Sequence, residues 1–205
     1  DNAGNLYVSD TRNHRVQKTQ LAPQIKIPAG QTSGSLKINM IQDQNDENDE
    51  TVILTPGTVN GVNNPNKDPI SFIINDDDDP PVITFVQSAE SIDENSSNDV
   101  IITATLSIVS QKDIEIPFTL SGTADASEYT VSASPIKISA GNLSGTINVS
   151  TKGKDDNDVE PKETIVLTYG TLVNASTTNT ETSVILLSDD KPTLTVSSDK
   201  DEFYE

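Results

Sequence analysis

The chain has 205 residues, with 32 acidic residues against 13 basic ones, a formal net charge of -19 and no Cys. This charge argues against nucleic-acid binding because phosphates would be repelled, and without Cys there is no disulfide, Cys-based zinc site or thiol nucleophile. Hydrophobic residues make up 33% and aromatic residues 4%, which suits the thin core of a small β-sandwich better than a large α/β enzyme. No apolar run approaches the roughly 18 residues of a membrane span. The charge balance favours a cation-binding, extracellular protein, with simple solubility as the alternative explanation.

Residues 1–20 are predicted to form a β-hairpin, with strands over residues 6–8 and 15–17 and a turn over residues 10–13 that is rich in Asp, Asn and Thr. The segment resembles one repeat of the NHL family of β-propellers, on the residues Gly4-Asn5-Leu6-Tyr7-Val8, Asp10 and Asn13-His14-Arg15-Val16. The resemblance gives His14, the only His of the chain, a structural role in a blade. One blade cannot bury both of its faces, since propellers need several.

From Leu21 onwards the sequence repeats itself. Residues 25–34 match 136–145 at an offset of 111, residues 47–55 match 160–168 after a slip of two, and residues 78–85 match 189–196 at 111 again. We therefore predict a truncated module over residues 21–80, a complete module over 81–191 and the first strand of a further module over 192–205. The chain reads as a piece of a longer protein.

The complete module alternates apolar and polar residues throughout. The apolar positions are Val100/Ile102/Ala104/Leu106, Ile114/Ile116/Phe118/Leu120, Ile136/Ile138, Ile147/Val149, Ile165/Leu167 and Val184/Leu186. A period of two with Gly, Asn, Ser and Asp between the runs predicts antiparallel strands, and no segment has a helical period. About seven strands in a module of this length indicate an all-β, immunoglobulin-like antiparallel β-sandwich, here in tandem. The acids of residues 76–79 before Pro80-Pro81, and Asp189-Asp190 before Pro192, mark the junctions.

Two acidic loops run directly into alternating strands: residues 155–163, and a weaker copy at residues 43–50. Carboxylates at this density repel one another, so such a loop is stable only if it is fully solvated or if it holds cations. Ca²⁺ takes six to eight oxygen ligands in flexible geometry. The clusters contain no nitrogen or sulfur ligand, which disfavours zinc, copper and iron. We expect Ca²⁺.

The module resembles a Calx-beta domain, the Ca²⁺-binding sandwich of sodium/calcium exchangers, integrin β4 and many bacterial surface proteins. The landmarks are Glu94, residues 122–129, residues 138–141, the loop with Asp155, Asp156, Glu160 and Glu163, and Asp189-Asp190. The resemblance implies that the Ca²⁺ ligands are Glu94, Glu128, Asp155, Asp156, Glu160, Asp189 and Asp190. Glu128 stands where the family usually has Asp, and Ser188 stands where its terminal acids often begin.

Glu163 is expected to face away from the ions or to support their ligands from outside, because Glu160 and Glu163 cannot both point inward from the same loop. In the truncated module the corresponding candidate ligands are Asp43, Glu47, Asp76, Asp77 and Asp78, with Gln42 in the place of Asp155. The strands that would complete this half-site are missing from the sequence, so we expect it to be incomplete.

We do not expect an enzyme. His14 lies in the hairpin, and no Ser-centred nucleophile turn, P-loop or dinucleotide fingerprint occurs. The abundant acids leave a hydrolase that uses a pair of carboxylates as the alternative, but Tyr129 is the only aromatic residue near the acids that could stack on a sugar.

Three functions remain open. The first is a Ca²⁺-rigidified structural or adhesive repeat of a larger cell-surface or secreted protein, bacterial in origin, whose partners are its neighbouring modules and a cell-surface protein or glycan. The second is a regulatory Ca²⁺ sensor as in the exchangers, and the third an inert spacer without metal. Near-millimolar affinity is typical of extracellular structural sites, whereas sub-micromolar affinity would indicate a sensor.

Because the truncated module lacks half of its strands, residues 1–80 should exchange their amide hydrogens faster than residues 81–190. Hydrogen-exchange mass spectrometry of the whole chain measures this directly. Equal protection of the two parts would refute the division into a truncated and a complete module.

Overall fold

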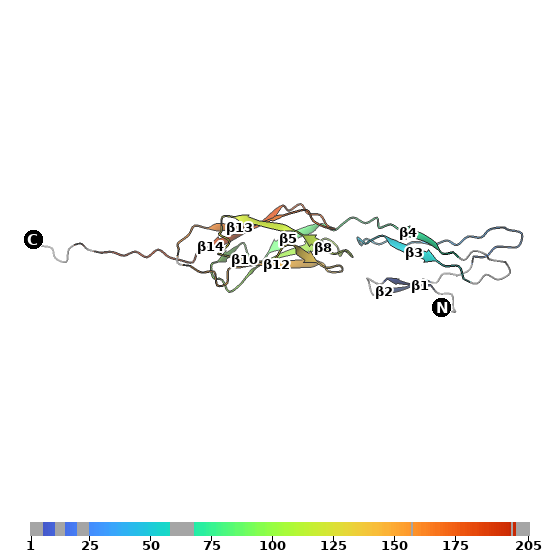
Figure 1. Cartoon of the computed structure of the whole chain (residues 1–205), viewed down its shortest axis with the longest axis horizontal. Helices are drawn as coiled ribbons and strands as arrows, with labels where there is room; N and C mark the ends of the chain where they lie inside the picture. The colour runs from blue at the N-terminus through green and yellow to red at the C-terminus, as the bar shows by residue number, and fades with distance from the viewer. Residues whose placement is uncertain are drawn as a thin grey trace, which may run out of the picture. The chain divides into compact units, whose positions relative to one another are not determined.

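The computed structural model describes residues 6–10, 15–19, 25–57, 68–156, 158–197 and 199. All of the regular elements in these residues are β-strands (Figure 1). The described part of the chain contains no helix that is long and apolar enough to cross a membrane. Two compact units are present, Asp1–Gln44 and Asn45–Glu205.

The first unit contains the predicted hairpin. Strand β1 (Leu6–Asp10) pairs antiparallel with β2 (Arg15–Thr19), with Leu6 opposite Thr19. The predicted strands over residues 6–8 and 15–17 are thus confirmed, while the turn from residue 11 and His14 lie outside the described residues.

Residues 25–27 form no strand, although their sequence matches 136–138 of the complete module. There, β11 (Ile136–Ile138) pairs with β8 (Ile114–Ile116). No counterpart of β8 stands before residue 25 in the sequence. The side chains of Ile25 and Ile27 are correspondingly 56% and 55% exposed.

The complete module is a sandwich of two facing sheets (Figure 1). One sheet has the order β10 (Thr130–Val131), β12 (Ser144–Ser150), β7 (Val100–Leu106) and β5 (Ile83–Gln87). The other has the order β6 (Ser91–Asp93), β14 (Glu181–Leu187), β13 (Glu163–Tyr169) and β9 (Phe118–Gly122). All pairs are antiparallel except β6 with β14, which run parallel.

Both sheets contribute to one core, and the predicted alternation explains it. Ile102 and Val149 of the first sheet, and Ile165, Leu167 and Val184 of the second, are completely buried. Burying a side chain of this size stabilises the fold by about 1.5–3 kcal/mol. The strand order and the shared core confirm the all-β, immunoglobulin-like sandwich.

Leu120, predicted to face the core, is 44% exposed. Pro117 separates β8 from β9, so Ile116 and Leu120 do not belong to one continuous strand. In addition, β9 is the last strand of its sheet, and only its first residue, Phe118, is buried.

The truncated module contributes a hairpin, β3 (Glu50–Leu54) and β4 (Ile70–Ile74). Glu50 lies opposite Ile74, as Glu163 lies opposite Leu186 in the complete module. This register aligns Asp76, Asp77 and Asp78 with Ser188, Asp189 and Asp190, one residue away from the alignment drawn from the sequence.

Gly122, at the end of β9, has φ +126°, and a Cβ at this position would lie 2.0 Å from the backbone oxygen of Thr164. Neither strand can move away there because β9 pairs with β13 at this point. We predict that G122A lowers the free energy of unfolding by about 2–4 kcal/mol. Urea unfolding measures the effect, and G57A is the control because a Cβ at Gly57 meets nothing within 4 Å. Equal stability of the two variants would contradict the prediction.

Candidate metal centre

The acidic side chains meet at one end of the sandwich because of the parallel pairing of β6 and β14. Parallel strands finish at the same edge, and the backbone N–H of Glu94 donates to the carbonyl of Leu187 over 2.9 Å. Glu94 follows β6 directly, and Asp189 and Asp190 follow β14. The strand pairing therefore brings residues almost one hundred positions apart together.

The loop that carries Asp155 and Asp156 is tied to the same edge by Thr151, whose side chain is completely buried. The Thr151 hydroxyl donates to the carbonyl of Asp93 over 2.7 Å and accepts from the N–H of Ser96. The N–H of Asn95 donates to the carbonyl of Lys154 over 3.1 Å. The role of Thr151 is not predictable from the sequence, since a Thr in a polar loop gives no signal of burial.

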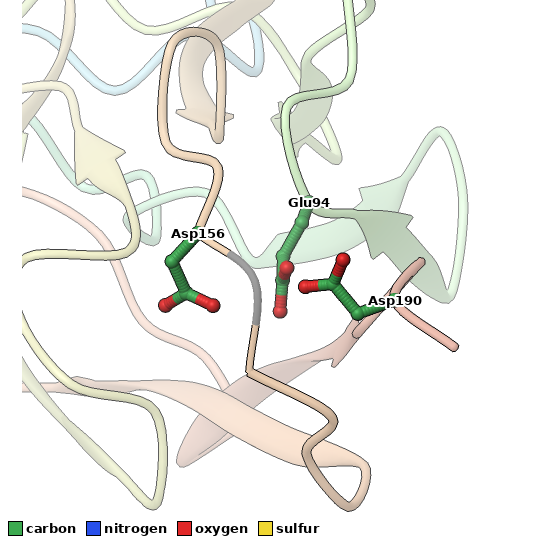
Figure 2. Close-up of side chains that lie close together, drawn as sticks. All are labelled: Glu94, Asp156 and Asp190. Atoms are coloured by element: carbon green, nitrogen blue, oxygen red, sulfur yellow. The ribbon is translucent and has the colours of Figure 1, made fainter. Parts of the chain in front are cut away.

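Glu94 is the centre of the first cluster. Its side chain is 5% exposed, and its Oε2 is buried without a hydrogen-bond partner. Ligand atoms of Glu94, Asp156 and Asp190 lie within 4.8 Å of one another, and Figure 2 shows the carboxylates of Asp156 and Asp190 on either side of that of Glu94. Glu94 makes a second such group with Asp155 and Asp189.

The electrostatics of this cluster are unfavourable for a charged Glu94. Burial, followed by the charges of Asp156, Glu160, Asp190 and Asp189, raises the pKa of Glu94 to about 7. Burial and then the charge of Asp189 also raise the pKa of Asp190, whose Oδ2 is buried and unpartnered.

A third group joins Glu128, Glu160 and Glu163, whose ligand atoms also lie within 4.8 Å of one another. Two hydrogen bonds position it: the N–H groups of Thr123 and Ala124 both donate to the Thr164 carbonyl, which holds the loop before Glu128 against β13. Burial, and then the charge of Glu128, raise the pKa of both Glu160 and Glu163.

The expectation that Glu163 faces away from the acids is therefore wrong. Glu163 is the first residue of β13, whereas Glu160 lies in the preceding loop. The alternation that would send side chains three residues apart to opposite faces holds only within a strand. The Oε2 of Glu163 is buried and has no hydrogen-bond partner.

The seven acids predicted for the complete module all fall in these three groups. The predicted candidates of the truncated module do not: among the described residues, no group of three acids within 4.8 Å includes Asp43, Glu47, Asp76, Asp77 or Asp78. Asp43 belongs to the first unit and the other four belong to the second.

The donor set suits a hard cation. Each side chain in the groups offers carboxylate oxygens only, and three of these oxygens, on Glu94, Glu163 and Asp190, are buried and unpartnered. A buried acceptor without a partner is costly, at about 1–3 kcal/mol or more when charged. A cation among these oxygens would remove that cost and the repulsion together.

No protein-family model and no curated protein sequence matches the chain. Among solved structures, it is similar to CBD12 from CALX1.2 (13% identity, 48% of this chain and 41% of that one, TM-score 0.39). It is also similar to the apo-form Calx CBD1 domain (12% identity, 53% and 98%, TM-score 0.41) and to domains 4 and 5 of the S-layer protein SbsC (19%, 60% and 59%, TM-score 0.27). The chain thus spans less than half of the CBD12 structure. These alignments are too loose to assign a family, and the sandwich is established by its strand order and its core.

The pKa of Glu94 predicts how stability depends on pH without metal. The pKa rises from 4.5 to about 7 on folding, so between these values the folded chain holds a proton that the unfolded chain releases. Stability should therefore fall as pH rises from about 4.5 to 7, with no further loss above 7. Urea unfolding in metal-free buffer at pH 5 and pH 8 measures this.

The variant E94Q isolates the contribution of Glu94, since Gln does not titrate. E94Q should show a smaller loss of stability between pH 5 and pH 8 than the wild type. The same loss in both proteins would contradict the assignment of the raised pKa to Glu94.

Proposed function

We propose that the complete module is a Ca²⁺-binding β-sandwich of a larger cell-surface or secreted protein, and that its ions stiffen an array of neighbouring modules. The observation that carries the proposal is the environment of Glu94. Its carboxylate is buried, its Oε2 has no hydrogen-bond partner, and the residue belongs to two of the acidic groups. A buried acid in contact with other acids is not explained by solubility, because solubility requires exposed charge.

The residues support Ca²⁺ over other metals. The ligands come from two loops and the ends of three strands, β6, β13 and β14. Such a site can adapt to the six to eight oxygens of Ca²⁺ more readily than to the strict octahedron of Mg²⁺. Glu94 with Asp156 and Asp190 would hold one ion, Glu94 with Asp155 and Asp189 a second, and Glu128 with Glu160 and Glu163 a third. The absence of nitrogen and sulfur in these groups disfavours zinc and copper.

The position of the acids supports a structural role. Asp189 and Asp190 stand just before Lys191-Pro192 and the segment predicted to begin the next module. Ions held there would therefore fix the exit of the chain from the sandwich. Fixing the exit of the chain in this way is what a structural or adhesive repeat, extracellular or at a cell surface, would require of its ions. The resemblances to Calx-beta domains and to an NHL repeat, given above on their residues, are in keeping with a bacterial surface protein. We infer a binding module rather than an enzyme, because a hydrolase that used a pair of these carboxylates would have only Tyr129 in the sequence near them to stack on a sugar.

Calorimetric titration of the whole chain with Ca²⁺, with thermal melting in Ca²⁺ and in chelator, tests the proposal. Ca²⁺ at 100 times its dissociation constant should stabilise the fold by about 2.7 kcal/mol, which raises the melting temperature by several degrees. D156N and E160Q should weaken the binding heat and the stabilisation. E181Q is the matched control, because Glu181 is exposed at the other end of β14 and its substitution removes the same charge.

The affinity decides between the functions. Dissociation constants of about 10⁻⁴–10⁻³ M are those of extracellular structural sites, whereas a sub-micromolar constant would replace the structural role with a sensor. If neither heat nor melting temperature responds to Ca²⁺, the module is a spacer and the proposal is wrong.

A further inference from the structure

The acidic loop of the truncated module already has a cation in contact with it, the ammonium group of Lys112. Nζ of Lys112 lies 2.6 Å from Oδ1 of Asp46 and 3.4 Å from Oδ2 of Asp76. Asp46 precedes β3 and Asp76 follows β4, whereas Lys112 belongs to the loop between β7 and β8 of the complete module. The side chain of Asp46 is 1% exposed and that of Lys112 is 21% exposed, so this ion pair is largely shielded from water.

The residues on either side of Lys112 complete the contact. The Ser110 hydroxyl donates to Oδ2 of Asp46 over 2.8 Å, so both carboxylate oxygens of Asp46 have partners. The Gln111 N–H donates to the Asp46 carbonyl over 3.0 Å, and the Gln111 side-chain amide donates to the carboxylate of Glu47. Three consecutive residues of one module thus bind two consecutive residues of the other.

The acidic loop is also held internally by carboxylates. The N–H of Glu47 donates to Oδ2 of Asp76 over 3.1 Å, and the N–H of Asp76 donates to Oδ1 of Asp49 over 3.0 Å. Asp76 is therefore shared between the backbone of the loop and the ammonium group of Lys112.

Comparison of the two modules shows that both carboxylates in contact with Lys112 are particular to the truncated one. In the strand register, Glu50 and Ile74 correspond to Glu163 and Leu186. Asp46, four residues before Glu50, therefore corresponds to Val159. Asp76, two residues after Ile74, corresponds to Ser188. The complete module thus has an apolar residue and a hydroxyl at these positions. Conversely, the complete module has buried carboxylate oxygens without a hydrogen-bond partner, on Glu94, Glu163 and Asp190, and the described residues of the truncated module have none.

We propose that Lys112 is the resident cation of the acidic loop of the truncated module, and that the joint between the β3–β4 hairpin and the sandwich is closed by this ammonium group without Ca²⁺. A buried carboxylate needs a charged or hydrogen-bonding partner, and Lys112 with Ser110 supplies both to Asp46. Burial lowers the pKa of Lys112, but the hydrogen bond and charge of Asp46 outweigh this, followed by those of Asp76, and the pKa is raised overall. Lys112 therefore stays protonated.

Hydrogen exchange of the whole chain, resolved by residue, tests the proposal in saturating Ca²⁺ and in chelator. In the wild type, the amides of Glu47 and Gln111 should be equally protected in both conditions. In K112M they should exchange about tenfold faster or more, because one partner of a buried ion pair is removed. K112R keeps the charge and should retain most of the protection.

K137M is the matched control, since Lys137 makes an exposed ion pair with Glu115 at 3.3 Å, with exposed fractions of 67% and 47%. Such a pair contributes little to stability, so K137M should leave Glu47 and Gln111 at wild-type protection. The amides of β7 and β13 report whether each variant keeps the sandwich.

Two results would overturn the proposal. One is wild-type protection of Glu47 and Gln111 in K112M. The other is loss of their protection in the wild type when Ca²⁺ is chelated, which would mean that a metal ion closes the joint. The proposal is separate from Ca²⁺ binding by the complete module, because neither result depends on Glu94 or its neighbours.

Discussion

The structure of the complete module depends on one constraint, that the alternation which builds its core also places an acid inside it. Ile92 is buried, Asp93 is exposed and Glu94 is buried again, as a strand with a period of two requires. Glu94 therefore continues the inward face of β6 past the last apolar side chain. After its partner β14, the same alternation leads from the buried Leu186 through Ser188 to the half-buried Asp190, while Asp189 is exposed. The cluster is an extension of the core in which carboxylates take the place of hydrocarbon.

The two modules resolve a concentration of carboxylates in different ways. In the complete module the buried oxygens of Glu94, Glu163 and Asp190 have no hydrogen-bond partner within the chain, so charge compensation has to come from outside. In the truncated module both oxygens of Asp46 are bound by Lys112 and Ser110. The two carboxylates that contact Lys112 are the side chains that differ at this place, since the strand register aligns Asp46 with Val159 and Asp76 with Ser188.

The features of the fold that depend on local pattern could be predicted from the sequence. The alternation gave the strands and the core, and the acids that the Calx-beta resemblance implied for the complete module are the acids that lie together. The contacts that could not be predicted from the sequence join residues far apart in the chain: Asp46 and Ser110 are separated by 64 positions and Asp93 and Thr151 by 58. No period or composition reports such a pair. The orientation of Glu163 was predicted incorrectly because Glu160 lies outside strand β13. The exposure of Leu120 was not predicted because its place in the last strand of the sheet is a property of the strand order.

The chemical difference between the two ends has a mechanical consequence under the two proposals. An ammonium group on its own chain is present at a fixed effective concentration and, when largely buried, is only weakly screened by salt. A Ca²⁺ ion is in exchange with its surroundings and leaves when their concentration falls below its dissociation constant. The joint at Lys112 would then stay closed in all ionic conditions, while the exit beyond Asp190 would stiffen only when Ca²⁺ is present. Under these proposals a single sandwich would have a metal-independent connection at one end and a Ca²⁺-dependent one at the other, without any change of fold.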